Sequence, residues 1–91
     1  MSETITVDAV REVLREQLAE ILYSELDEIG EDTNFEKMGL DSVLSVELTA
    51  FINAQYGLAE KMEVIYQNPT LNKLAQYVVT LVADGAAATR S

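Results

Sequence analysis

Apolar residues recur at steps of three and four in two stretches of the chain, one near each end. The first stretch predicts an amphipathic helix over about residues 7–24, with Thr6 as its N-cap. The second predicts a closing helix from a cap at Thr70 to about residue 83. The positions that carry the two apolar stripes are Val10, Val13, Leu14, Leu18, Ile21 and Leu22, followed by Leu71, Leu74, Ala75, Val78 and Val82.

Between residues 24 and 40 the helical period breaks down, and glycine, aspartate, threonine and asparagine accumulate. This pattern predicts a long ordered loop. Ordering a loop of this length costs conformational entropy, so we expect buried apolar side chains to anchor it. The candidate anchors are Ile29, Phe35, Met38 and Leu40.

A second helix is predicted to begin at or just after Ser42 and to run to about Tyr56, where Gly57 supplies a C-terminal stop. A short third helix is predicted within residues 60–67, because the Asn68-Pro69 pair that follows breaks helices. The expected core positions of these two helices are Leu48, Phe51, Ile52 and Tyr56, and then Met62, Val64, Ile65 and Tyr66.

Together these elements predict an all-α fold, a small four-helix bundle with three longer helices, one short helix and a long first loop. We expect the domain to cover residues 6–83, between a flexible N-terminus at 1–5 and a flexible alanine-rich tail at 84–91. The 91 residues, 48% of them apolar, suffice for one small core.

The chain is strongly acidic, with a net charge of −10 and a pI of about 4.1. This charge disfavours nucleic acid as a partner, because phosphate contacts need clustered lysine and arginine. Many of the acids lie between Glu25 and Glu36. That segment is either a solvated acidic loop or a docking site for a basic protein, and the sequence leaves both interpretations open.

Several classes of site and location are disfavoured. The absence of cysteine removes disulfides and thiolate metal sites, and no apolar run approaches the roughly 18 residues of a membrane span. The N-terminus lacks a secretory signal. An EF-hand calcium loop is excluded by spacing, because Ile29 or Met38 would occupy a ligand position. We therefore expect a soluble cytoplasmic protein with no metal site and no membrane partner.

The stretch Gly39-Leu40-Asp41-Ser42 places one serine hydroxyl where a loop enters a helix. A serine in this place is often simply an N-cap. The chain contains no histidine and no cysteine, so Ser42 lacks the imidazole that usually activates a serine nucleophile. Any chemistry at Ser42 must be performed by a partner, and we expect no catalytic residue in this chain.

The Gly39-Leu40-Asp41-Ser42 turn, the pattern of helices and the acidic composition resemble the acyl carrier protein family over about residues 6–83. The resemblance implies that Ser42 carries 4′-phosphopantetheine, attached by a phosphopantetheinyl transferase, and that acyl cargo is held on its thiol as a thioester. Gly39 is then expected to supply unusual backbone angles, Leu40 to tuck under the loop, and Asp41 to face the transferase or its magnesium.

Two positions favour one branch of this family. Leu40 stands where peptidyl carriers usually have a second glycine, and Pro69-Thr70 precedes the last helix, as is common in carriers of polyketide synthases. The resemblance therefore favours a polyketide carrier that works with ketosynthase, acyltransferase and tailoring enzymes, and we expect it to be a monomer. A peptidyl or fatty acid carrier and a non-carrier acidic helical docking module remain alternatives.

The second helix also offers a candidate partner-binding surface. Val43, Val46 and Ala50 share one face beside Ser42, and Glu47 lies among them. The alternative is that these small residues widen the core stripe. Met62 and Ile65 are further candidates, for a groove that shields cargo, although residues at such spacing more often belong to the core.

Overall fold

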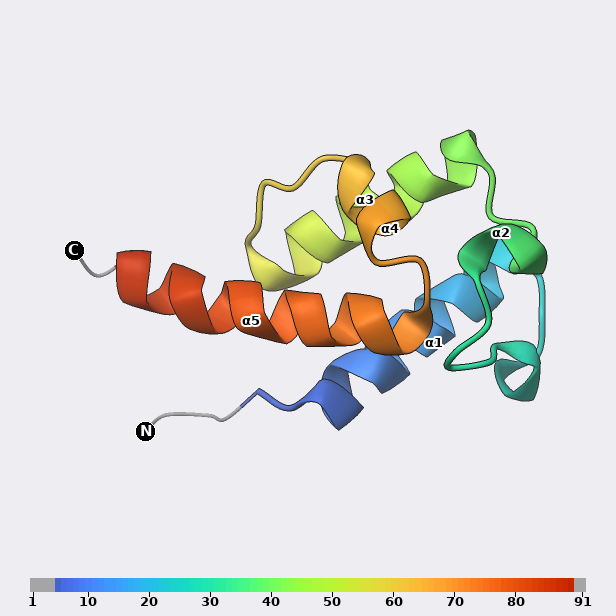
Figure 1. Cartoon of the computed structure of the whole chain (residues 1–91), viewed down its shortest axis with the longest axis horizontal. Helices are drawn as coiled ribbons and strands as arrows, with labels where there is room; N and C mark the ends of the chain where they lie inside the picture. The colour runs from blue at the N-terminus through green and yellow to red at the C-terminus, as the bar shows by residue number, and fades with distance from the viewer. Residues whose placement is uncertain (1–4, 90–91) are drawn as a thin grey trace.

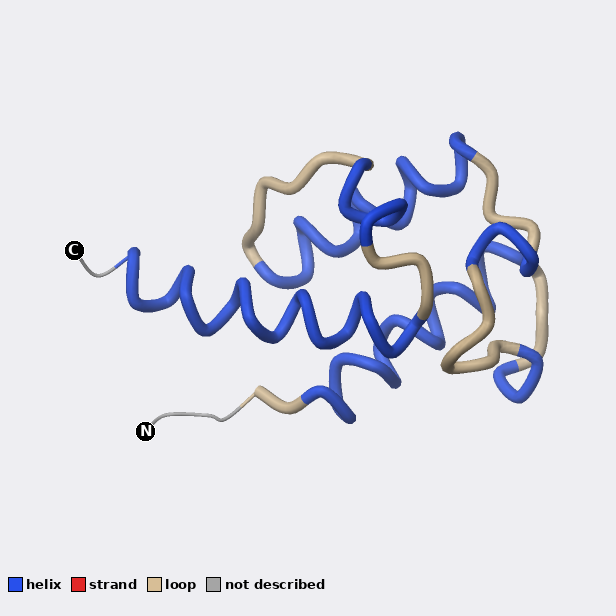
Figure 2. The backbone as a smooth tube through the Cα atoms, viewed as in Figure 1, coloured by secondary structure: helices blue, strands red, loops and turns tan. Residues whose placement is uncertain are grey.

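The computed structural model describes the backbone of residues 5–89 and the side chains of residues 5–83. Every regular element in this range is helical (Figure 2), which confirms the all-α prediction and its three longer helices. The elements are α1 (Val7–Leu22), a 3₁₀ turn η1 (Leu26–Glu28), α2 (Phe35–Met38), α3 (Ser42–Tyr56), α4 (Glu63–Gln67) and α5 (Leu71–Thr89).

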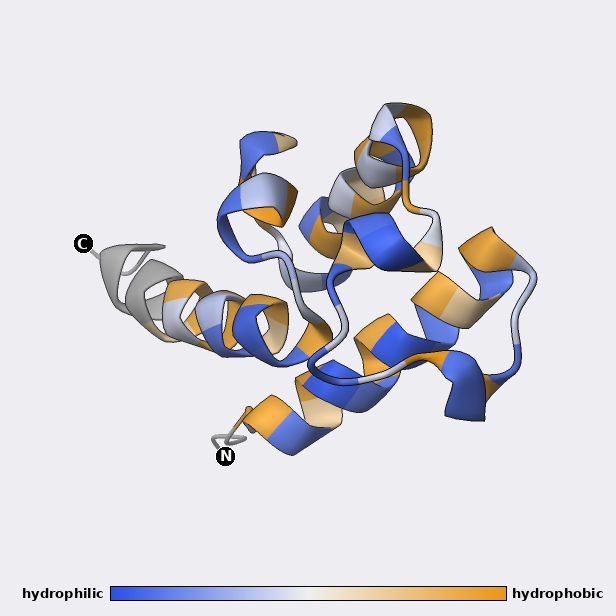
Figure 3. Cartoon of the chain, turned by 45° about the vertical axis from the view of Figure 1, so that its right-hand side comes forward, coloured by the Kyte–Doolittle hydropathy of each residue, from blue (hydrophilic) through white to orange (hydrophobic). Residues whose placement is uncertain are grey.

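The three longer helices pack around one core. Helix α1 makes its main contact with α5, and α3 contacts both α1 and the short helix α4. Helix α5 lies along the long axis of the molecule, with α2 near the end opposite the C-terminus (Figure 1). Helix α1 carries both hydrophobic and hydrophilic residues (Figure 3), and its buried residues Val10, Leu14, Leu18 and Ile21 follow the three- and four-residue steps of an amphipathic helix.

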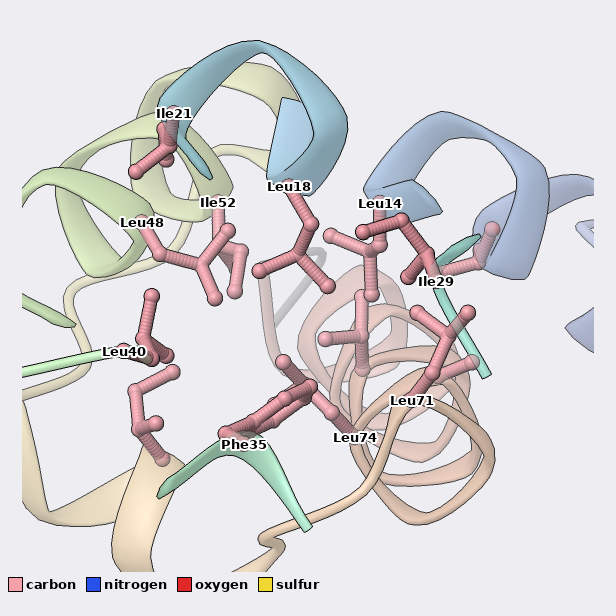
Figure 4. Close-up of a cluster of buried hydrophobic side chains, with 14 of the residues drawn as sticks. Leu14, Leu18, Ile21, Ile29, Phe35, Leu40, Leu48, Ile52, Leu71 and Leu74 are labelled. Atoms are coloured by element: carbon pink, nitrogen blue, oxygen red, sulfur yellow. The ribbon is translucent and has the colours of Figure 1, made fainter. Parts of the chain in front are cut away.

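The core is built from leucine and isoleucine side chains of all three longer helices (Figure 4). Three of the four expected loop anchors, Ile29, Phe35 and Leu40, are buried among them, which confirms their role. Met38 is partly buried against the edge of this core. The fully buried side chains include Leu14 and Leu18 of α1, Leu48 and Ile52 of α3, and Leu71 and Leu74 of α5.

Helix starts agree with the sequence. The hydroxyl of Thr6 accepts a 3.1 Å hydrogen bond from the N–H of Ala9, and that of Thr70 accepts one of 3.2 Å from Lys73, so both predicted caps are confirmed. Helix α1 ends at Leu22, two residues before the predicted end, because the next residue adopts a left-handed conformation.

The first loop contains two short helical turns, η1 and α2, where the sequence predicted no helix. Each is too short to show a periodic pattern. Helix α2 is held at its N-terminal end by two hydrogen bonds: the Asn34 side chain accepts one of 2.9 Å from the N–H of Glu36, and the N–H of Phe35 donates to the carbonyl of Pro69 at 2.8 Å. The segment before α5 therefore positions the turn that leads into α3.

The acidic part of the loop is tied to α1 and α5. The N–H of Asn72 donates to the Glu31 carbonyl at 3.0 Å, and its side-chain amide donates to the Asp32 carboxylate at 2.9 Å. Arg11 donates to the Asn72 side chain at 3.0 Å, and Arg15 to the Glu31 carboxylate at 2.7 Å. Glu31 and Asp32 therefore hold the loop in place.

Helix α5 continues to Thr89, so the predicted end near residue 83 is wrong. Alanine has the highest helix propensity, and a single glycine costs only about 1 kcal/mol, so this composition does not stop a helix.

At the N-terminal end of the described chain, Ile5 packs against the core. The remaining parts of the expected flexible ends, residues 1–4 and 90–91, lie outside the described residues. None of the described helices is long and apolar enough to cross a bilayer.

Candidate functional site

The turn between α2 and α3 reverses the chain at a glycine. Gly39 is the C-cap of α2 with φ 99°, a left-handed value at which a side chain is strained. Its N–H bonds back to the carbonyls of Phe35 and Glu36, and the N–H of Leu40 donates to Phe35 at 3.0 Å. The Leu40 side chain is buried. The geometry expected of Gly39 and Leu40 is therefore present.

Ser42 is the first residue of α3, and its side chain is exposed. The N-cap is Asp41, whose carboxylate accepts a 2.9 Å hydrogen bond from the N–H of Leu44. The interpretation of Ser42 as an ordinary N-cap is therefore wrong. Among the described residues, none forms a hydrogen bond with the Ser42 hydroxyl.

The start of α3 retains free hydrogen-bond donors. Its hydrogen-bond ladder begins with the N–H of Ser45, which donates to the Asp41 carbonyl at 2.9 Å. Within the described part of the chain, the N–H groups of Ser42 and Val43 have no carbonyl partner. These donors and the positive end of the helix dipole favour an anion beside Ser42.

Ser45, one turn after Ser42 on α3, differs from it in accessibility. Ser45 is buried, and its hydroxyl donates to the Asp41 carbonyl at 2.8 Å. A bulky enzyme or cofactor therefore cannot reach Ser45 without opening the helix, whereas Ser42 is open to solvent.

Two neighbouring hollows extend from Ser42 toward the interior. The outer one has a volume of about 350 Å³ and the inner one about 160 Å³, and both are bordered by Glu36, Leu40 and Tyr66. The outer hollow is completed by Gly39, Asp41 and Ser42, and the inner one by Asn34, Phe35, Ser45, Ile65 and Pro69.

The outward face of α3 carries the residues that the sequence offered for partner binding. Val43 is 66% and Val46 55% exposed, and Glu47 and Ala50 are exposed as well. The alternative in which these residues widen the core is therefore wrong. These exposed side chains, apolar except for Glu47, are available for contact, and their use by a partner stays a prediction.

The candidates in the third helix are placed differently. Ile65 is only 2% exposed, which confirms the core position that its spacing favoured, and it also lines the inner hollow. Its contact with cargo or a partner stays a prediction. Met62 is partly buried and precedes α4, which begins at Glu63. Helix α4 lies within the predicted range 60–67, and the Asn53 side chain makes two 2.9 Å hydrogen bonds to the backbone of Glu60 in the loop before it.

Two residues beside Ser42 were missed by sequence reasoning. Tyr66 was expected in the core, yet it is 54% exposed and borders both hollows. Val64 and Ile65 fill the inward face of the single turn of α4, so the next residue turns outward. Glu36 borders the same hollows, and no sequence signal distinguished it from the other loop acids.

No three His, Cys, Asp or Glu residues of the described chain are grouped to hold a metal ion.

Comparison with known proteins gives a consistent result. A family model described as "Phosphopantetheine attachment site" matches residues 12–78. The chain is 38% identical over 77 residues to the polyketide synthase PksL of Bacillus subtilis, covering 85% of this chain and 2% of that protein. It is 32% identical over 78 residues to the acyl carrier protein TtuC of Teredinibacter turnerae, covering 86% of this chain and 90% of that one.

A solved structure shows the same fold. The NMR structure of the HMG-ACPI domain from the CurA module of Lyngbya majuscula is 37% identical, with a TM-score of 0.82, and the match covers 94% of this chain and 90% of that domain. The chain thus spans almost all of a carrier domain, but only about 2% of the length of the polyketide synthase PksL.

Proposed function

Because this chain belongs to the phosphopantetheine-binding acyl carrier family, we propose that Ser42 is the residue to which its 4′-phosphopantetheine is attached. Members of this family are generally non-catalytic, and carrier domains of polyketide synthases work with the enzymes of the synthase. The observation that carries the proposal is the exposed Ser42 hydroxyl at the start of α3, which Asp41 leaves free by taking the capping role.

The residues around Ser42 fit the group. The free N–H groups of Ser42 and Val43 offer donors to a phosphodiester, and the helix dipole contributes about 0.3–1 kcal/mol for an anion in the first turn. The carboxylates of Asp41 and Glu36 oppose it, but both residues are exposed and their repulsion is screened by water and salt. The outer hollow gives the arm a place to lie beside Tyr66.

The attachment step is a phosphoryl transfer that a separate transferase performs. The Ser42 oxygen attacks the pantetheine-side phosphorus of coenzyme A, its proton passes to a base of the transferase, and adenosine 3′,5′-bisphosphate leaves. This chain contributes the exposed hydroxyl and a rigid helix start. It has no histidine or cysteine to activate the serine, so activation of the hydroxyl is left to the transferase.

When bound, 4′-phosphopantetheine supplies a terminal thiol that holds an acyl chain as a thioester. The cargo proposed for this chain is a polyketide intermediate, supported by the similarity to PksL. The proposed partners are the phosphopantetheinyl transferase and the ketosynthase, acyltransferase and tailoring enzymes of a synthase. Val43, Val46, Glu47 and Ala50 form the α3 surface that these enzymes contact.

Intact-mass measurement tests the proposal. The protein is incubated with coenzyme A, Mg²⁺ and a broad-specificity phosphopantetheinyl transferase, beside the variants Ser42→Ala and Ser24→Ala. We expect one added phosphopantetheine in the parent and in Ser24→Ala, and none in Ser42→Ala. Addition that persists in Ser42→Ala would refute the assignment. No addition to the folded parent, by a transferase active on another carrier, would favour the acidic docking module.

A further inference from the structure

The segment of residues 31–38 is bounded by a glycine at each end. A Cβ at Gly30 would meet the Thr33 hydroxyl, and Gly39 has φ 99°, so both positions favour glycine. Hinges in proteins are a few loop residues that absorb a large change in backbone angles, and glycine has the widest range of these angles. Both ends of the segment are therefore suited to act as hinges.

This segment forms one wall of the inner hollow beside Ser42. Asn34, Phe35 and Glu36 border the hollow from the segment, and α3, α4 and Pro69 border it from the opposite side. Phe35 is 3% exposed and points into the core (Figure 4). The hollow measures about 160 Å³. A protein cavity of about 150 Å³ holds one benzene molecule, so an acyl group of more than about six carbon atoms needs a larger space.

The beginning of the segment is tied to α1 and α5 through Glu31. The Glu31 carboxylate accepts a 2.7 Å hydrogen bond from Arg15 and lies 3.5 Å from Nε of Arg11. The side chains of Arg15 and Arg11 are only 16% and 19% exposed, so these contacts are partly shielded from water. The N–H of Asn72 donates to the Glu31 carbonyl at 3.0 Å. Glu31 therefore joins the segment to two helices at once.

The middle of the segment is tied to the far side of the hollow by one backbone hydrogen bond, from the N–H of Phe35 to the carbonyl of Pro69 at 2.8 Å. The backbone donors of residues 36–40, as far as the described chain pairs them, bond within residues 34–40. Helix α2 can therefore keep its own hydrogen bonds when the contacts of Glu31 and Phe35 are broken.

We propose that residues 31–38 are a lid over the inner hollow, which turns about Gly30 and Gly39 and is held shut by Glu31. In the open state the contacts of Glu31 and Phe35 are broken together, α2 stays intact, and the hollow admits a longer acyl group. The inference rests on the proposed function only for the nature of that occupant. The closed state predominates, because opening moves the Phe35 ring from the core into water.

Amide hydrogen exchange of the protein without phosphopantetheine, followed by NMR, tests the lid independently of any cargo. The N–H groups of Phe35 and Asn72 bond across the two edges of the lid, whereas those of Leu18 and Val78 lie inside α1 and α5. We expect Phe35 and Asn72 to share one opening constant, at least about tenfold larger than that of Leu18 and Val78, because a local opening costs less than global unfolding.

Two variants separate the lid contact from a general effect of charge. Glu31→Gln and Glu12→Gln each remove one carboxylate that pairs with Arg15, but Glu12 belongs to α1 and does not touch the lid. Glu31→Gln should raise the opening constant at Phe35 and Asn72 about threefold to fivefold, the size of a partly exposed ionic contact. Glu12→Gln should leave it unchanged, and Leu18 should respond equally to both variants.

A longer acyl group should hold the lid open. The protein is loaded from acetyl-coenzyme A and from octanoyl-coenzyme A by a phosphopantetheinyl transferase, and intact mass verifies each adduct. We expect the octanoyl form to lose the exchange protection that the acetyl form retains at Phe35 and Asn72.

Three results would overturn the proposal: one opening constant shared by Phe35, Asn72 and Leu18, a Glu31→Gln response at Asn72 without one at Phe35, or an octanoyl form that keeps the protection of the acetyl form. A missing adduct would count against Ser42 as the attachment residue. The exchange of the unloaded protein then still decides whether the lid exists, so the two failures are distinguished.

Discussion

The N–H of Leu44 donates a 2.9 Å hydrogen bond to the carboxylate of Asp41. This bond makes Asp41 the cap of α3 and leaves Ser42, between them, with a free hydroxyl in the first position of the helix. Structural and functional roles are thereby divided between adjacent residues. The sequence analysis expected Asp41 to face the transferase or its magnesium. That contact stays a prediction, in addition to the capping role.

Substitutions at Asp41 separate the two roles. Asp41→Ala removes the cap and should lower the free energy of unfolding by about 1 kcal/mol, whereas Asp41→Asn, an equally good cap, should keep it within a few tenths. If the carboxylate also serves the transferase, both variants lose loading rate. Urea denaturation and the rate of phosphopantetheine addition measure the two effects. Equal stability of Asp41→Ala and the parent would contradict the capping role.

Relief of strain at Tyr23, which follows α1 with φ 56°, should stabilise the fold. The left-handed conformation costs a non-glycine residue about 1–2 kcal/mol, and a glycine adds about 0.5–1 kcal/mol of chain entropy to the unfolded state. Tyr23→Gly should therefore raise the free energy of unfolding by up to about 1 kcal/mol. Tyr23→Ala, which keeps the strain, should not. A Tyr23→Gly variant that melts well below the parent would show that the tyrosine ring contributes to the fold.

Two apolar residues of α3 should differ sharply in their effect on stability. Leu48 is fully buried and Val43 points to solvent. Leu48→Ala leaves a cavity and should cost about 2–5 kcal/mol, whereas Val43→Ala should change stability by less than about 0.5 kcal/mol. Chemical denaturation gives both values. A large loss of stability in Val43→Ala would mean that the valine packs in the core and is not free for a partner.

Tyr77 should contribute to loss of stability at high pH. Burial raises its pKa above 10.0, and the hydrogen bond to Glu60 at 3.1 Å and the negative charge of Glu60 raise it further. The folded state then holds the phenol proton more tightly than the unfolded state, so this contribution is complete below pH 10 and is lost as pH rises through the folded pKa. Tyr77→Phe should show a shallower fall in melting temperature above pH 10. An unchanged alkaline profile would exclude Tyr77 as a cause.

Much of the helical framework was predictable because its signals are local. The apolar periodicity of the three longer helices, the caps at Thr6 and Thr70 and the stop at Gly57 each depend on residues within a turn or two. The two short turns of the first loop, η1 and α2, were not predictable in the same way. Helix α2 depends on a hydrogen bond from the Phe35 N–H to the carbonyl of Pro69, a residue far away in the sequence.

Some features of the candidate site were likewise predictable from local sequence and others were not. The turn at Gly39 and the position of Ser42 at a helix start follow from local backbone preferences, which the residue types indicate. Whether Val43 and Tyr66 face solvent, and which residues border each hollow, depends on how α3, α4 and the loop pack together. Periodicity defines the faces of a helix, but only neighbouring elements decide which face is covered.

The sequence by itself determined the helical class of this protein, its three longer helices and the serine that opens the second of them, because each follows from short-range sterics and hydrogen bonding. Only the tertiary structure decided that Asp41 caps in place of Ser42, that Ile65 is buried while Tyr66 is exposed, and that residues of α2 border the inner hollow. These features depend on contacts between residues that are distant in sequence, because only the packing of neighbouring elements decides which side chains are buried.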